Sequence, residues 1–187
     1  PIKGTIARGK TPEEDLRNAE WLQSSQKNLA ENVMIVDLLR NDLSKHATHV
    51  EVPHLCELQS FANVHHLVST VTGKLKPESS PIDLLRDAFP GGSITGAPKI
   101  RAMEIIEELE PNRRSIYCGS IGYISVDGQM DTNIAIRTLV CDKENIHCWG
   151  GGGIVADSIC NTEYEETLAK VNVILQNLEE YFSVKSV

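Results

Sequence analysis

The sequence lacks the long hydrophobic run that a membrane-spanning helix needs, because no stretch approaches roughly 20 apolar residues. It also lacks an excess of basic residues, since 26 Asp and Glu outweigh 18 Lys and Arg for a net charge of −8. Nucleic-acid binding depends on clustered Lys and Arg. We therefore expect neither a membrane nor a nucleic acid as partner, although one buried arginine or metal ion could still bind a small anion.

The spacing of the cysteines indicates neither a disulfide framework nor a zinc site. The five cysteines are scattered, odd in number and show no CxxC spacing. Free thiols in a reducing compartment are typical of such a pattern, so we expect a cytoplasmic location. A composition of 41 % hydrophobic and 24 % charged residues indicates an ordinary globular protein.

Neither repeats nor linkers divide the chain, and its length suits one domain or part of a larger one. Thr11-Pro12 with Glu14 predicts a capping box that starts a helix over 11–27. Further helices are expected over 28–44, 80–89, 99–110 and 162–182. Strands are expected over 49–60 and 68–76, where β-branched residues are frequent.

The second half changes character. Asp127-Gly128, between "YCGSIGYISV" and "QMDTNIAIRTLVC", predicts a β-hairpin, and "ENIHCW" predicts another strand that ends in four glycines. Helices and antiparallel hairpins mix without regular βαβ alternation, so the predicted fold class is α+β.

Three acidic residues could hold a metal. Glu163 and Glu166 share one face near a helix start, where complementing the helix dipole is an alternative explanation. Glu31 precedes an apolar run that must face a core. Three carboxylates brought together would need a cation, and an all-oxygen ligand set suits Mg²⁺.

Other candidates concern an anionic ligand. Arg137 lies in a largely apolar predicted strand, where it either makes a structural salt bridge or clamps a ligand carboxylate. The glycines at 150–153 form either a flexible turn or a close approach to a ligand. Nothing in the pattern decides whether His65 or His66 points inward. The loop "PGGSITGAPK" at 90–99 does not match the phosphate-loop pattern GxxxxGK[ST], although its N–H groups could still meet an anion.

Taken together, the motifs carry a specific resemblance. "PIKGT", "AENVMIVDLLRNDL", "HLVSTVTGKL", "FPGGSITGAPKIRAMEIIEELEP", "CGSIGY", "MDTNIAIRT", "GGGIVADS" and "EYEETLAKVNVIL" occur in the order seen in chorismate-utilising enzymes. The chain resembles the C-terminal part of the aminodeoxychorismate synthases, which serve 4-aminobenzoate and folate synthesis. Their relatives are the anthranilate, isochorismate and salicylate synthases. The resemblance implies the chorismate-binding fold, in which antiparallel sheets carry helices outside, with residues 1–187 forming part of one catalytic domain.

Lys3 is the residue that separates these enzymes, since anthranilate synthases generally read PIAGT where this chain reads PIKGT. The resemblance implies that Lys3 attacks C2 of chorismate as the 4-hydroxyl leaves. Ammonia from a glutaminase partner or fused domain then adds at C4 and expels the lysine. An amine attacks only when neutral, and we expect a rigid turn around Lys3 to orient it.

The resemblance assigns further roles position by position. It implies that Mg²⁺ is bound by Glu31 and Glu166 directly and by Glu163 through water, and that His66 acts near the departing hydroxyl. The implied substrate contacts are Thr5, Ser93, Tyr117, Arg137, the backbone N–H of Gly153, and Lys170.

Two departures leave alternatives open. Relatives usually carry Asp or Glu where this chain has Asn28, which weakens the expected metal affinity. Family members are also more than twice this long, so the N-terminal half of the fold is expected to be missing here. Anthranilate synthase component I and a non-catalytic fragment of such an enzyme are the alternative functions.

Overall fold

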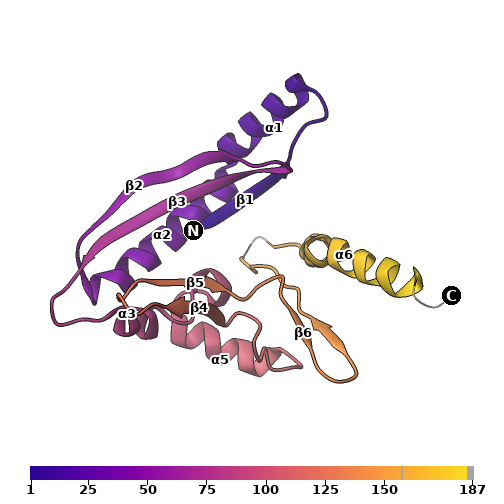
Figure 1. Ribbon diagram of the computed structural model, residues 1–187. Helices are drawn as coiled ribbons and strands as arrows, with labels where there is room; N and C mark the ends of the chain where they lie inside the picture. The colour runs from indigo at the N-terminus through magenta and orange to yellow at the C-terminus, as the bar shows by residue number, and fades with distance from the viewer. Residues whose placement is uncertain (157, 185–187) are drawn as a thin grey trace. The chain divides into compact units, whose positions relative to one another are not determined.

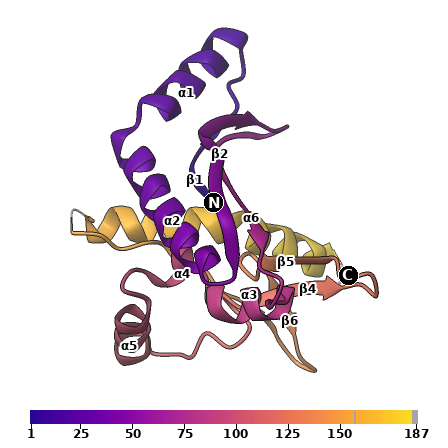
Figure 2. The same ribbon diagram turned by 90° about the vertical axis from the view of Figure 1, so that its left-hand side faces the viewer.

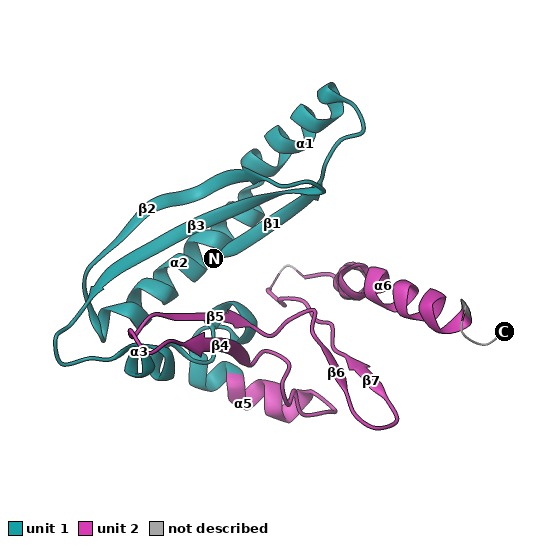
Figure 3. Ribbon diagram, viewed as in Figure 1, with its two compact units in different colours: residues 1–102 teal, residues 103–187 magenta. Residues whose placement is uncertain are grey.

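The structure is a computed structural model that describes residues 1–156 and 158–184. It contains two compact units, Pro1–Ala102 and Met103–Val187, which Figure 3 distinguishes by colour. Both units combine helices with antiparallel sheets, which confirms the predicted α+β class.

Unit 1 is built on a three-stranded antiparallel sheet in the order β1-β3-β2. Its strands are β1 (Ile2–Ala7), β2 (Ala47–Ser60) and β3 (Val64–Leu75). Helix α1 (Pro12–Ser24) leads into α2 (Gln26–Ser44), which runs along the sheet and contacts all three strands (Figures 1 and 2). Alternate residues of β3 point toward this side, so that His65, Leu67 and Ser69 are buried.

Local signals explain where the first helices begin. The Thr11 hydroxyl accepts a hydrogen bond from the Glu14 N–H at 3.2 Å, as predicted. The capping box is not reciprocal, however, because the Glu14 carboxylate accepts from the N–H of Lys10 rather than of Thr11. The predicted second helix is confirmed as α2, and its Ile35 and Val36 pack into a core with Leu22.

Three shorter helices follow β3: α3 (Pro81–Ala88), α4 (Gly92–Thr95) and α5 (Lys99–Leu109). Ser80 and Asp83 form a complete capping box at the start of α3. The predicted glycine-rich loop at 90–99 contains one short helical turn, α4. The helix predicted after this loop is confirmed as α5. Residues 89–98, between α3 and α5, are called the Ser93 loop below.

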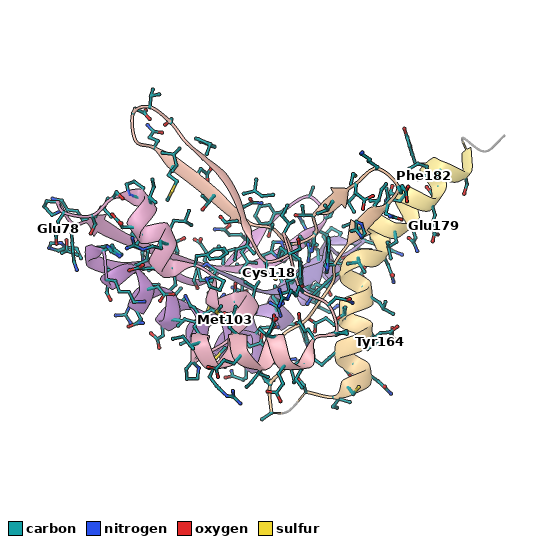
Figure 4. The ribbon with its side chains drawn as sticks, turned by 90° about the horizontal axis from the view of Figure 1, so that it is seen from below. Glu78, Met103, Cys118, Tyr164, Glu179 and Phe182 are labelled. Carbon is teal, nitrogen blue, oxygen red and sulfur yellow. The ribbon has the colours of Figure 1, made fainter. Side chains whose placement is uncertain are left out.

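Unit 2 contains two hairpins and a long helix. Strands β4 (Ser120–Ile124) and β5 (Met130–Ile134) pair across Asp127-Gly128, which confirms the predicted hairpin. Strands β6 (Leu139–Cys141) and β7 (Ile146–Cys148) form the second hairpin, and α6 (Cys160–Val184) ends the described chain. Figure 4 labels Tyr164 and Phe182 on α6, and both are exposed.

The cysteines and the helices bear on two expectations about the whole chain. All five cysteines are free thiols, with Cys118 buried and labelled in Figure 4, in agreement with the absence of a disulfide pattern. Among the described residues, every helix is too short or too polar to cross a membrane.

Candidate functional site

Lys3 lies in a β-bulge of β1, so the prediction of a turn at this motif is wrong. Ile2 pairs with Val68 and Thr5 with His66, which leaves Lys3 and Gly4 together opposite one residue of β3. Gly4 has a φ of 89°, which an L side chain rarely adopts. A Cβ on Gly4 would also lie 3.0 Å from Leu22 Cδ1. Glycine is therefore required beside Lys3, whose side chain is half-buried.

Two predicted site residues, Thr5 on β1 and His66 on β3, are in direct contact. The Thr5 hydroxyl lies 2.8 Å from His66 Nδ1 although 61 residues separate them in sequence. His65 faces the other side of β3, where Ser60 Oγ lies 2.8 Å from Nδ1 and Asp15 Oδ1 lies 3.0 Å from Nε2. His65 is therefore a buried structural residue with both ring nitrogens engaged. His66 is the histidine beside Thr5, and its implied role near the departing hydroxyl stays a prediction.

Glu31 lies half-buried on α2, in the same unit as Lys3. One turn earlier, Asn28 donates from its side-chain amide to Ser25 Oγ at 2.9 Å. A Cβ on Gly4 would lie 3.1 Å from Asn28 Cβ, so the bulge that carries Lys3 packs against this turn of α2. The residue that departs from the family pattern thus borders the Lys3 bulge.

The Ser93 loop is tied to α2 at two places. Gly92 abuts Leu38, because a Cβ on Gly92 would lie 1.9 Å from Leu38 Cδ2. Lys99 Nζ donates to Asp42 Oδ2 at 2.8 Å and to the Ala88 carbonyl at 3.0 Å, which closes the loop across its ends. Ser93 is half-buried on α4 within this loop.

In unit 2, the hairpin brings Tyr117 and Arg137 to one end. The Cys118 N–H donates to the Ala135 carbonyl and the Ala135 N–H donates to the Gly119 carbonyl, both at 2.9 Å. These bonds extend the β4–β5 pairing beyond the strands themselves. Tyr117 precedes this pairing and Arg137 follows it by two residues, so the two predicted carboxylate contacts share one end of the ladder.

The prediction that Arg137 sits inside one long apolar strand is wrong. The segment 135–138 interrupts it, leaving β5 and β6 as separate strands. Arg137 is exposed, and its φ of 50° lies in the left-handed region. Such a backbone costs free energy in a non-glycine residue and is frequent at binding sites. The structure therefore exposes Arg137 instead of burying it in a strand, and its role stays a prediction.

Tyr117 is half-buried in a polar setting. The Arg114 guanidinium lies 5.8 Å from the centre of its ring, and a Cβ on Gly151 would lie 2.7 Å from its hydroxyl oxygen. Burial, with a smaller contribution from the Cys118 thiol, raises the pKa of Tyr117 to about 12. The phenol therefore stays protonated at neutral pH and can donate a hydrogen bond to an anion.

The glycines after β7 lie against the first turns of α6. A Cβ on Gly152 would lie 3.6 Å from Glu163 Oε2 and 3.7 Å from Lys170 Nζ. A Cβ on Gly153 would meet open space. Lys170 Nζ donates to the Gly151 carbonyl at 3.1 Å and pairs with Glu166 Oε1 at 2.7 Å. The structure thus gathers Tyr117, Glu163, Glu166 and Lys170 around the glycine loop, and their roles stay predictions.

The two acids on α6 differ in their surroundings. Glu163 is only 7 % exposed and accepts a hydrogen bond from Ser158 Oγ at 2.7 Å, whereas Glu166 is exposed. Carboxylate oxygens fit Mg²⁺ as a donor set. Within either unit, no three acidic, histidine or cysteine side chains of the described residues lie close enough to hold a metal. The predicted metal set takes Glu31 from unit 1 and the other acids from unit 2.

Sequence patterns did not single out several buried polar residues of this arrangement. Asn32 is fully buried on α2, Asp42 is 4 % exposed, and Ser69 is buried on β3. A polar residue directly before the apolar run "VMIV" was the signal available for Asn32. No local pattern marked Asp42, whose partner Lys99 lies 57 residues further along the chain.

Comparison with known proteins identifies the class. The chorismate binding enzyme family matches residues 1–176, so the chain belongs to this family. Aminodeoxychorismate synthase component 1 of Escherichia coli K12 is 57 % identical over 182 residues, covering 96 % of this chain and 40 % of that protein. Anthranilate synthase component 1 of Aquifex aeolicus is 47 % identical over 181 residues, covering 96 % of this chain and 37 % of that protein.

Solved structures agree on the fold. Anthranilate synthase component I from Streptococcus pneumoniae matches with a TM-score of 0.80 and 42 % identity, covering 90 % of this chain and 40 % of that one. The menaquinone-specific isochorismate synthase of Escherichia coli matches with a TM-score of 0.81 at 24 % identity, covering 91 % and 39 % of the two chains. The chain thus spans about two fifths of the length of each of these four relatives.

Proposed function

We propose that this chain belongs to an aminodeoxychorismate synthase, which converts chorismate and ammonia to 4-amino-4-deoxychorismate and water. The observation that carries the proposal is the position of Lys3, whose amine is carried by a bulge that requires glycine. Thr5, the residue that follows this bulge, is hydrogen-bonded to His66. Identity to aminodeoxychorismate synthases of 56–57 % in the enterobacterial relatives, against 46–48 % to anthranilate synthases, supports the same choice.

The reaction proceeds in two displacements. The neutral Nζ of Lys3 forms a bond to C2 of the ring, both ring double bonds shift, and the bond from C4 to its hydroxyl breaks. His66 donates a proton or hydrogen bond to that hydroxyl, which leaves as water. Ammonia then attacks C4, the double bonds shift back, and the bond between C2 and Lys3 breaks. The lysine leaves as a free amine and the enolpyruvyl group is retained.

The remaining predicted residues bind and orient the substrate. Tyr117, Arg137 and the N–H of Gly153 hold the enolpyruvyl carboxylate, for which the protonated phenol and the guanidinium are suited donors. Thr5 fixes His66 through Nδ1 and thereby sets which ring nitrogen faces the substrate. Ser93 and Lys170 contribute further polar contacts to the pocket.

Magnesium is part of the proposal. Glu31, Glu163 and Glu166 would hold it, and when bound it would neutralise the ring carboxylate of the dianionic substrate. A glutaminase subunit or fused domain would supply the ammonia, and the cytoplasm is the proposed location. The word "component" in the names of the bacterial relatives agrees with a multi-part enzyme.

The test uses the full-length protein with chorismate, Mg²⁺ and ammonium. We expect 4-amino-4-deoxychorismate with no release of pyruvate. Lys3→Ala should abolish the covalent adduct seen by mass spectrometry, whereas Lys10→Ala, at an exposed lysine of the same segment, should leave it intact. Pyruvate release would instead support an anthranilate synthase. Unchanged turnover in Lys3→Ala would contradict a nucleophilic role, and a folded protein without turnover would support a non-catalytic role.

A further inference from the structure

A buried amide on α2, next to Glu31, is bonded to β3, the strand that pairs with the Lys3 bulge of β1. Asn32 has no exposed surface. Its Nδ2 donates to the Leu67 carbonyl at 3.1 Å, and its Oδ1 accepts from Ser69 Oγ at 2.5 Å. Because an unpaired amide in this position would cost free energy, both bonds define where α2 meets β3.

The partners of Asn32 border the Lys3 bulge. Leu67 is the β3 residue opposite Lys3 and Gly4, since its neighbours pair with Ile2 and Thr5. The N–H of Ser69 donates to the Pro1 carbonyl at 2.9 Å, on the other side of Lys3. Asn32 therefore contacts β3 at Leu67, which lies opposite the Lys3 bulge, and at Ser69, which holds the chain at Pro1 just before it.

The same residue follows Glu31 directly on α2. Successive residues of a helix are rotated by about 100°, so an Asn32 side chain fixed against the sheet also fixes the direction of Glu31. Ser69 Oγ accepts from the Cys56 N–H at 2.8 Å as well, which ties β2 into the arrangement. One small network thus links α2 to β3, to β2 and to the residue before β1.

We propose that Asn32 is a positioning residue, which sets the placement of the Lys3 bulge relative to Glu31 and thereby the approach of the amine to the substrate. The proposal rests on the proposed function. Only a side chain with both a donor and an acceptor satisfies this position: leucine offers neither, and aspartate turns a carboxylate toward the Leu67 carbonyl.

The experiment compares Asn32→Leu, Asn32→Asp and Ser69→Ala in the full-length protein, with Asn41→Leu at an exposed position of α2 as the matched control. Because misplacement of a reacting group by about 1 Å can cost about 100-fold in rate, we expect kcat per folded enzyme to fall about 10- to 100-fold in both Asn32 variants. KM for chorismate should change less than about threefold. Ser69→Ala, which keeps the bond to Leu67, should lose less, and Asn41→Leu should match the wild type.

Hydrogen exchange of the amides of residues 2–7 provides a readout that needs no activity. Faster exchange of β1 in Asn32→Leu and Ser69→Ala, with Asn41→Leu unchanged, supports the positioning role. Unchanged kcat per folded enzyme, or unchanged exchange of β1, overturns it. If Asn32→Leu does not fold, Ser69→Ala decides by the same two measurements. A wild-type enzyme that makes no aminodeoxychorismate overturns the proposed function. The exchange data then still test whether Asn32 holds β1 in place through β3.

Discussion

The ion pair between Asp42 and Lys99 permits a quantitative test of how the Ser93 loop is anchored. The side chains are 5 % and 16 % exposed, and their charged atoms lie 2.8 Å apart. Asp42 has a second cation, Lys45, at 3.3 Å, but that side chain is 48 % exposed. Each partner can be replaced by a neutral residue of similar size, in Asp42→Asn or Lys99→Met. Asp42→Asn leaves the Lys99 charge without its carboxylate, whereas Lys99→Met leaves Asp42 paired with Lys45.

The expected magnitudes follow from burial. Removing one partner of a buried ion pair costs about 3–5 kcal/mol, because the other charge remains desolvated, and we expect this for Asp42→Asn. Lys99→Met leaves Asp42 with Lys45, and a partly exposed pair contributes up to about 1 kcal/mol, so this variant should cost about 1 kcal/mol less. The double variant leaves no buried Lys99 or Asp42 charge. It should cost less than the sum of the two by about 2 kcal/mol.

Urea unfolding followed by circular dichroism measures these free energies. The matched control is Asp37→Asn, which breaks the Asp37–Arg40 pair on the same helix, where the side chains are 69 % and 50 % exposed. This change should cost about 0.5 kcal/mol or less. If Asp42→Asn costs no more than Asp37→Asn, or if the double variant is additive, the pair does not anchor the loop and the reasoning from burial fails.

Three further outcomes test unit 2 and the start of unit 1. Gly151→Ala should displace the Tyr117 hydroxyl and cost about 1–3 kcal/mol in unfolding free energy, whereas Gly153→Ala, in open space, should not. In an ultraviolet titration of the wild type, one tyrosine should ionise near pH 12, and this ionisation should be missing in Tyr117→Phe. Because this folded-state pKa is raised, the free energy of unfolding should fall between about pH 10 and 12, and it should fall less in Tyr117→Phe. A hydrogen bond from Arg8, the largest cause, lowers the pKa of Asp15, so stability should fall as the pH drops below about 4, and less so in Asp15→Asn.

Much of the local structure could be predicted from neighbouring residues. Ser80-Pro81 with Asp83 contains its own capping partners, and Asp127-Gly128 has the backbone freedom that a tight hairpin needs, with Gly128 at a φ of 85°. The apolar run after Glu31 predicted a helix facing a core, which is α2. These features depend on residues within about one or two turns of each other, so the sequence contains their causes.

The errors have a common origin in long-range pairing. The motif at Lys3 reads as a turn in isolation, but β3 pairs with it on both sides and makes it a bulged strand. The apolar stretch around Arg137 reads as one strand, but Cys118 pairs with Ala135 and the chain then leaves the ladder. In both places partners many residues away determined the backbone.

The amino-acid sequence by itself determined the helices, the hairpin turns and, through its motifs, the family and the residues predicted to act. Only the tertiary structure decided that His66 rather than His65 lies beside Thr5, and that Asn32 and Asp42 anchor the surrounding elements. The physical reason is that strand register and buried polar bonds join residues distant in sequence. Their free energy is gained only when the chain has packed, so no local pattern reports it.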